Sequence, residues 1–211
     1  MNLPNGVTTR IVLIRHGEPS AAARGKCYGK LDVGLSENGG TQIEATADLT
    51  AKIEFAAVYS SPRVRAVESA KILARRQNLS IEICEDFAEI DFGDFEGLEY
   101  AEVERRFPTL YRQWMDAPTT VEFPNGESFA AMRGRVLRGF ERLKQRHAGA
   151  AFAVVSHGGV NRIVLADVLK IGNADIFRLE QSYAAANMID FYDDFPVVRA
   201  MNLTTENFLW L

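Results

Sequence analysis

The sequence predicts a single α/β domain, a three-layer α/β/α sandwich with a mostly parallel central sheet. Short apolar runs alternate with longer amphipathic segments along the 211 residues, and no repeat, low-complexity tract or linker interrupts them. Two of the apolar runs end at a histidine that is followed by glycine, His16-Gly17 and His157-Gly158. Because ligands bind at the carboxyl ends of strands in open α/β sheets, we expect both histidines at one functional edge.

The first half of the chain contains three predicted strands and two predicted helices. Ser36 can cap the first helix, and Ser61 can cap the second with Pro62 at its first helical position. In order, the predicted elements are strand 10–14, a loop over 25–34, helix 37–52, strand 56–59, a helix from Pro62 with apolar residues at Val64, Val67, Ala70, Ile72 and Leu73, and strand 81–84.

The second half of the chain contains three further helical segments and three strands. Pro108 is expected to break the first of these helices, and Asn125-Gly126 predicts a turn. The two last strands form a closing hairpin, with Phe195-Pro196 near its turn. In order, the predicted elements are an ordered loop over 90–98, the broken helix 99–114, helix 129–146, strand 151–155, helix 160–169 and the hairpin strands 185–192 and 197–203.

The composition excludes several classes of protein. The chain is 47% hydrophobic and 25% charged, which is typical of a globular protein, and its net charge of -4 argues against nucleic acid or an anionic membrane as partner. No apolar stretch is long enough for a membrane span and no signal-peptide pattern is present, so neither is expected. Cys27 and Cys84 lie far apart, which predicts a reducing, cytoplasmic location without disulfides.

The residues around the first histidine suit the binding and attack of a phosphoryl group. Neutral imidazole is a good nucleophile, and the fork of Arg15, beside His16, matches phosphate oxygens. The segment 60–66 follows a strand and opens a helix, so that its N–H groups and arginines also face the strand ends. A surface turn or a core histidine explains each motif alone, whereas together they predict an anion site.

A phosphoryl-transfer site also needs a carboxyl group that protonates the leaving oxygen. Glu89 lies among apolar and aromatic neighbours, a setting that suits such an acid. The third histidine, His147, ends a helix, where a cation near the last carbonyls is reason enough for it. Spacing does not choose among the six carboxylates of this region, because Glu89 is accompanied by Glu85, Asp86, Asp91, Asp94 and Glu96.

These motifs resemble the histidine phosphatase superfamily over residues 11–203, in the branch that includes cofactor-dependent phosphoglycerate mutase and small-molecule phosphatases. The signature is Arg15-His16-Gly17-Glu18, in which the resemblance makes His16 the residue that becomes phosphorylated. It implies a phosphoglycerate mutase-like fold with no metal and no cofactor.

The resemblance also assigns roles to other residues. It selects Arg65 over Arg63, because the phosphate-binding arginine of the family directly precedes alanine, and it selects Glu89 as the acid. The implied catalytic residues are Arg15, His16, Arg65, Glu89 and His157, and the implied phosphate ligands are Arg15, Arg65, His157 and Gly158.

The resemblance favours a hydrolase over a mutase. The mutases carry arginine directly after the acid and tyrosine two residues later, where this chain has Ile90 and Phe92. The implied function is metal-independent hydrolysis of a small phosphorylated metabolite through a phosphohistidine. A phosphoglycerate mutase and a non-catalytic phosphoester-binding module are the alternatives.

Substrate specificity is expected to depend on a helical insert over the site, residues 99–125. Five of its side chains either reach over the pocket or pack within the insert: Arg105, Arg106, Tyr111, Arg112 and Trp114. Segments 27–32 and 124–129 look like those of α-ribazole phosphatases, which suggests α-ribazole 5'-phosphate as substrate, although phosphatases of other specificity share both segments. The expected partner is a small phosphorylated substrate, and a homodimer stays open.

Overall fold

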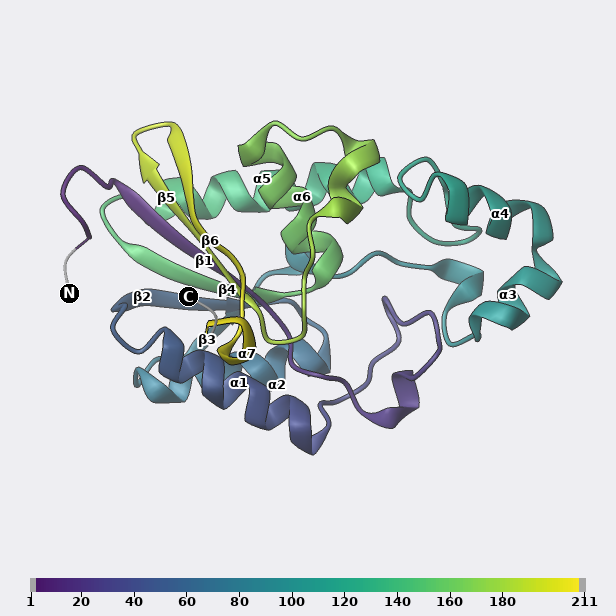
Figure 1. Cartoon of the computed structure of the whole chain (residues 1–211), viewed down its shortest axis with the longest axis horizontal. Helices are drawn as coiled ribbons and strands as arrows, with labels where there is room; N and C mark the ends of the chain where they lie inside the picture. Colours follow the sequence, from purple (N-terminus) through teal and green to yellow (C-terminus); the bar gives the residue numbers. More distant parts are fainter. Residues whose placement is uncertain (1–2, 209–211) are drawn as a thin grey trace.

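A six-stranded sheet forms the centre of the computed structural model, which describes residues 3–208 (Figure 1). Its strands are β1 (Thr9–Arg15), β2 (Phe55–Ser60), β3 (Ile81–Ile83), β4 (Ala151–Ser156), β5 (Ala186–Tyr192) and β6 (Phe195–Leu203). They lie in the order β3-β2-β4-β1-β5-β6. The first four are parallel, β5 is antiparallel to β1, and β6 is antiparallel to β5. The mostly parallel sheet is therefore confirmed.

Helices cover both faces of this sheet, which confirms the three-layer architecture (Figure 1). One face carries α1 (Glu37–Leu49) and α2 (Val64–Arg76), and the other carries α5 (Phe129–Arg146) and α6 (Gly158–Leu169). The helices α3 (Tyr100–Arg106) and α4 (Pro108–Asp116) extend to one side, and α7 (Thr205–Phe208) lies beside α1. None of the helices within residues 3–208 is long and apolar enough to cross a bilayer.

The central strand β1 supplies side chains to the cores on both faces of the sheet. Ile11 and Leu13 pack in the core formed with α5 and α6, whereas Val12 and Ile14 pack in the core formed with α1 and α2. All four side chains are at most 1% exposed. A strand that is buried on both faces needs apolar side chains at successive positions. The apolar run within residues 10–14 therefore predicts such a strand.

The start of α2 differs from the prediction. The helix begins at Val64 rather than at Pro62, and Ser61 does not cap it. The first helical N–H, that of Val64, donates instead to Asp32 Oδ1 at 2.8 Å. The Ser61 hydroxyl accepts the N–H of Arg63, the residue before the helix, at 3.3 Å and lies 2.7 Å from His157 Nε2, so it links two distant segments instead of capping the helix.

Most other boundaries agree with the sequence within a few residues. Pro108 separates α3 from α4, and Ser128 caps α5 by accepting the Ala131 N–H at 3.2 Å. The first helix ends at Leu49 instead of residue 52, and α6 begins at Gly158 instead of residue 160. Four short 3-10 segments were not predicted: Ala21–Ala23, Glu85–Phe87, Gly93–Phe95 and Asn173–Arg178.

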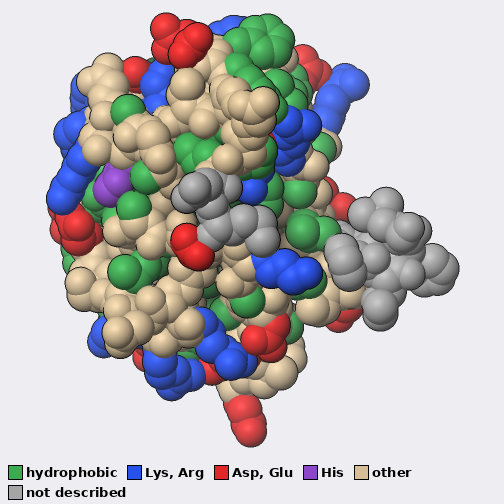
Figure 2. All heavy atoms as spheres, turned by 90° about the vertical axis from the view of Figure 1, so that its left-hand side faces the viewer, with side chains coloured by type: hydrophobic (Ala, Val, Ile, Leu, Met, Phe, Trp, Pro, Cys, Tyr) green, Lys and Arg blue, Asp and Glu red, His purple; other side chains and the backbone are tan. Residues whose placement is uncertain are grey.

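The end of the molecule away from α3 and α4 carries charges of both signs. Figure 2 shows basic and acidic side chains spread between polar ones on this face. Around the β5–β6 hairpin, Asp190 pairs with Arg10 at 2.6 Å and with Arg199 at 3.0 Å. Lys144 pairs with Asp194 at 3.3 Å. These basic residues pair with carboxylates, whereas the described arginines Arg15, Arg65 and Arg162, at the carboxyl ends of the strands, donate to backbone carbonyls.

Candidate active site

The two histidines meet at the carboxyl ends of neighbouring strands. Strands β1 and β4 pair in parallel with Arg15 opposite Ser156, and the His16 N–H donates to the Ser156 carbonyl at 2.9 Å. The ring centroids of His16 and His157 are 5.2 Å apart, and the two residues are 2% and 0% exposed. The structure thus brings together two residues that are 141 positions apart in the sequence (157 minus 16).

The imidazole of His16 has one ring nitrogen free for attack. Its Nδ1 lies 2.7 Å from the Gly17 carbonyl oxygen. A carbonyl only accepts hydrogen bonds, so Nδ1 carries the proton and Nε2 keeps its lone pair. Burial, followed by the positive charges of Arg65 and Arg15, holds the pKa of His16 well below 6.5. His16 is therefore neutral at neutral pH, the form in which imidazole is nucleophilic.

His157 is bound on one side only. Its Nε2 lies 2.7 Å from the Ser61 hydroxyl, while its Nδ1 is buried without a hydrogen-bond partner in the described part of the chain. Burial is the largest cause that keeps the pKa of His157 well below 6.5, and the charge of Arg65 adds to it. When the hydroxyl donates to Nε2, the ring proton is on Nδ1, where it can be donated to an anion.

Arg15 and Arg65 are held by carbonyl groups rather than by carboxylates. Arg15 Nη1 donates to the Gln181 carbonyl at 2.5 Å. Arg65, which is fully buried, donates to the carbonyls of Gly29 at 2.9 Å and Leu31 at 3.0 Å. The Nε atoms of both arginines are buried and unpartnered within residues 3–208. Burial lowers the pKa of Arg65 although the charges of Glu89 and Asp32 oppose that shift, so its positive charge is only partly compensated. Buried cations that are only partly compensated are costly, and the pair is therefore suited to bind an anion.

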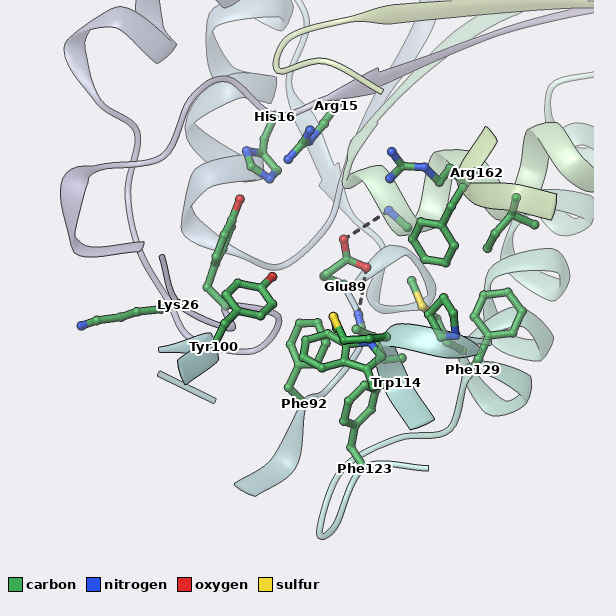
Figure 3. Close-up of a pocket in the computed structure, with 18 of the residues that line it drawn as sticks. Arg15, His16, Lys26, Glu89, Phe92, Tyr100, Trp114, Phe123, Phe129 and Arg162 are labelled. Carbon is green, nitrogen blue, oxygen red and sulfur yellow. Dashed lines mark hydrogen bonds between the residues drawn. The ribbon is translucent and has the colours of Figure 1, made fainter. Parts of the chain in front are cut away.

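Arg162 is a third cation of this site, and the sequence analysis missed it. Figure 3 shows its guanidinium beside that of Arg15. Its Nε donates to the Leu179 carbonyl at 2.8 Å, and a Cβ added to Gly158 would lie 3.0 Å from its Nη1. Burial and the charge of Arg15 lower the pKa of Arg162. The sequence did contain a signal for Arg162, because it lies four residues after Gly158. This spacing places Gly158 and Arg162 on one face of α6.

Glu89 faces the same space from the loop that follows β3 (Figure 3). Its carboxylate accepts the Ile90 N–H at 3.0 Å and the Gly159 N–H at 3.3 Å. A Cβ on Gly159 would lie 2.5 Å from Glu89 Oε1, so a larger residue at this position would displace the carboxylate. The structure thereby places Glu89 against the first turn of α6, close to His157.

Of the six carboxylates that the sequence left open, only Glu89 lines the cavity in the described structure. Four of the other five, Asp86, Asp91, Asp94 and Glu96, have structural partners elsewhere. Asp86 pairs with Arg142 at 2.7 Å, and Asp91 pairs with Lys30 at 3.1 Å. Glu96 accepts backbone N–H groups of the loop that begins at residue 29. Position in the fold thus separates the candidate acid from its neighbours.

A cavity of about 390 Å³ lies next to these polar residues. One end is charged and the other is apolar, as Figure 3 shows. A volume of this size suits a small molecule that has a phosphate and one further group. The residues that line the charged end are Arg15, His16, Arg65, Glu89 and Arg162, and those of the apolar end include Ile90, Phe92, Tyr100, Trp114, Met115, Phe123, Phe129, Met132, Ile176 and Phe177.

The insert contributes to this cavity mainly through side chains other than the five that were left open. Of the five residues that were left open, Trp114 lines the cavity and the other four do not. Tyr111 packs against Trp114 with ring centroids 6.4 Å apart, and Arg106 lies 3.4 Å from Glu102. Arg105 and Arg112 are exposed. The sequence analysis did not identify Met115 and Pro118, which also line the cavity.

The buried histidines make stability depend on pH. The unfolded chain protonates histidine near pH 6.5, whereas the folded chain keeps His16 and His157 neutral to much lower pH. The unfolded state therefore binds more protons below pH 6.5, and the free energy of unfolding should fall as the pH falls. We expect a slope of up to about 1.4 kcal/mol per pH unit for each histidine between about pH 6.5 and 5.5.

Urea unfolding across this pH range measures that slope. A His16→Ala variant should show a shallower slope, because one of the buried imidazoles with a lowered pKa is removed. A free energy of unfolding that stays constant over the range would contradict the neutral buried imidazoles.

Comparison with known proteins agrees with this geometry. The model of the histidine phosphatase superfamily (branch 1) matches residues 11–204. A bifunctional protein of Mycobacterium tuberculosis is 36% identical over 201 residues, which cover 94% of this chain and 55% of that protein. The chain therefore spans about half the length of this curated relative. Phosphoserine phosphatase 1 of Hydrogenobacter thermophilus is 29% identical over 92% of both chains.

Solved structures share the fold over nearly the whole chain. The α-ribazole phosphatase of Shigella flexneri superposes with a TM-score of 0.84 and 26% sequence identity. The superposition covers 92% of this chain and 96% of the other. The similarity therefore includes the sheet, both helical layers and the segments that contribute to the cavity.

Proposed function

Because the chain belongs to branch 1 of the histidine phosphatase superfamily, we propose that it hydrolyses small phosphomonoesters through a phosphohistidine on His16. The observation that carries this proposal is the neutral imidazole of His16, whose free Nε2 lies beside two arginines with unpartnered Nε atoms. The similarity to phosphatases such as phosphoserine phosphatase 1 of Hydrogenobacter thermophilus supports it.

In the first step of this mechanism, Arg15, Arg65 and the Nδ1–H of His157 hold the phosphoryl oxygens. The N-terminus of α6, which begins at Gly158, adds its backbone dipole. His16 Nε2 attacks phosphorus in line and forms the N–P bond while the ester P–O bond breaks. Glu89 in its protonated form donates its proton to the leaving oxygen, and the alcohol departs.

In the second step, water hydrolyses the phosphohistidine. The Glu89 carboxylate takes a proton from the water, whose oxygen attacks phosphorus as the N–P bond breaks. Inorganic phosphate leaves, His16 regains its Nε2 lone pair, and Glu89 is again protonated. Both steps need Glu89 near the reacting oxygen, which agrees with its position at the charged end of the cavity.

A panel of phosphorylated metabolites assayed for released phosphate tests this function. Hydrolysis supports the phosphatase, and binding without turnover would favour the non-catalytic module. Isomerisation of phosphoglycerates that outpaces their hydrolysis would favour the mutase. The panel includes α-ribazole 5'-phosphate, because the structural similarity to the α-ribazole phosphatase of Shigella flexneri supports that substrate.

We expect activity to survive an excess of chelator and to be inhibited by vanadate. Among residues 3–208, no three His, Cys, Asp or Glu side chains are grouped so that they could hold a metal ion. Arginines at the charged end can neutralise the transferring phosphoryl group instead. Vanadate adopts the trigonal-bipyramidal shape of that group and should compete with substrate. Loss of activity in chelator that is restored by a divalent metal would contradict the mechanism.

We further propose that residues 99–125 cover the substrate and that the protein acts in the cytoplasm. Tyr100 and Trp114 line the cavity from α3 and α4, which supports the covering role.

The proposed cytoplasmic location rests on the cysteines. Cys27 and Cys84 are both unpaired and buried, which supports a reducing compartment. Burial, together with the charge of Glu96, raises the pKa of the Cys27 thiol to about 12, so that thiol is protonated and unreactive.

A further inference from the structure

The end of the cavity away from His16 is walled by aromatic side chains that hold one another in place (Figure 3). The rings of Phe92 and Phe123 meet edge to face with centroids 4.9 Å apart. Trp114 contacts both rings, at 5.4 Å and 5.5 Å, and stacks on Tyr100 at 5.6 Å. This wall is therefore apolar, and its rings are packed on one another.

The mouth of the same compartment is lined by exposed apolar side chains. Tyr100, Met115 and Phe177 line the cavity and are 43%, 48% and 54% exposed. They come from α3, α4 and the 3-10 segment 173–178, so three separate elements place apolar surface at one opening. Exposed apolar side chains gathered around a cavity are typical of a binding site for an apolar group.

The charged side chains of the cavity are concentrated at the phosphate end. Arg162 Nε is bonded to a backbone carbonyl, and its guanidinium lies beside Arg15 and 5.4 Å from the ring centroid of Phe177, where the two ends of the cavity meet. The other charged residue lining the described cavity is Lys26, and Figure 3 shows its side chain directed away from the aromatic wall. Among the described residues, the wall formed by Phe92, Trp114 and Phe123 therefore presents aromatic surface and no charged group to a substrate.

We propose that the substrate is the phosphate monoester of an aromatic or otherwise apolar alcohol. This inference rests on the phosphatase function proposed above and adds the class of leaving group. Burying a carboxylate and an ammonium group against aromatic rings is costly, whereas burying an apolar ring is favourable. The compartment thus disfavours a zwitterionic alcohol such as serine, although a relative is named phosphoserine phosphatase 1.

Four alkyl phosphates test the proposal by their kcat/KM values: 2-phenylethyl phosphate, ethyl phosphate, phosphoethanolamine and O-phosphoserine. We expect 2-phenylethyl phosphate to exceed each of the others by about 100-fold, since one methylene in an apolar pocket already changes this ratio by roughly 10-fold or more. The ammonium group makes the alkoxide of the last two a better leaving group. Leaving-group reactivity alone would therefore make phosphoethanolamine and O-phosphoserine react faster. A preference for 2-phenylethyl phosphate would then have to come from its binding in the cavity.

Two matched phenylalanine variants locate the preference in the structure. Phe177→Ser removes an exposed ring at the mouth of the cavity, and Phe195→Ser removes one that is 70% exposed on the β5–β6 hairpin. Phe177→Ser should lower the ratio of kcat/KM for 2-phenylethyl over ethyl phosphate by about 10-fold. Phe195→Ser should keep the ratio of the unaltered protein, since Phe195 does not line the cavity.

The outcomes separate this inference from the function on which it rests. If no ester is hydrolysed, the proposed function fails and the inference fails with it. If ethyl phosphate or phosphoserine is hydrolysed as efficiently as 2-phenylethyl phosphate, the protein is a phosphatase but the inference is overturned. An equal change of the ratio in Phe177→Ser and Phe195→Ser would also overturn it, because the preference would not reside in the cavity.

Discussion

Replacing His16 with alanine should abolish phosphatase activity, with a loss of roughly 10⁴–10⁶-fold in kcat, because the covalent step disappears. The fold should persist, since His16 belongs to neither of the cores that flank the sheet and its ring bonds only the neighbouring Gly17 carbonyl. Circular dichroism and thermal unfolding check the fold. Acid-labile, base-stable phosphate should be trapped on the unaltered protein during turnover and be absent from the variant.

His147→Ala is the matched control for this experiment. The His147 ring lies 2.8 Å from the Tyr59 hydroxyl and packs on Phe152, and it does not line the cavity. The control should keep its activity and its trapped phosphate. Unchanged activity in His16→Ala, or a comparable loss in His147→Ala, would rule out His16 as the nucleophile.

Local signals in the sequence were sufficient to predict most of the elements. Ser36 caps its helix as expected, because the signal and its effect lie three residues apart. The order of the strands was not predicted, since β1 pairs with β4 and β5, which lie more than 130 residues further along the chain. Such pairings depend on packing between distant segments, which periodicity within one segment does not describe.

The candidate site shows the same division between local and distant effects. A strand that ends in His-Gly was enough to place His16 and His157 at one edge. Ser61 was misread as a helix cap because its partner, His157, lies 96 residues away. Arg162 was missed because the helix was predicted to begin at residue 160. In the structure α6 begins at Gly158, and Arg162 lies one turn further along the helix. Spacing did not separate Glu89 from five neighbouring carboxylates, and the resemblance selected it before the structure showed where the others pair.

Replacing Glu89 with glutamine should slow the first chemical step on alkyl phosphates by roughly 10²–10⁴-fold, the usual contribution of a positioned acid. The same variant should lose much less with p-nitrophenyl phosphate, because a nitrophenolate leaves almost without help from a proton. Glutamine keeps the shape of the side chain and one oxygen that accepts the Ile90 N–H, and loses only the longer contact with the Gly159 N–H. Single-turnover rates of His16 phosphorylation provide the measurement, since the second step also depends on Glu89.

Asp91→Asn is the matched control, two residues further along the same loop. Asp91 pairs with Lys30 at 3.1 Å and does not line the cavity. Any loss of activity in Asp91→Asn should therefore be the same for both leaving groups. The deciding quantity is how strongly the loss of activity depends on the leaving group. A general acid contributes more when the departing oxygen is more basic, whereas a structural carboxylate affects all substrates alike. An equal loss on both substrates in Glu89→Gln would therefore make Glu89 structural, and the proton would have to come from another group.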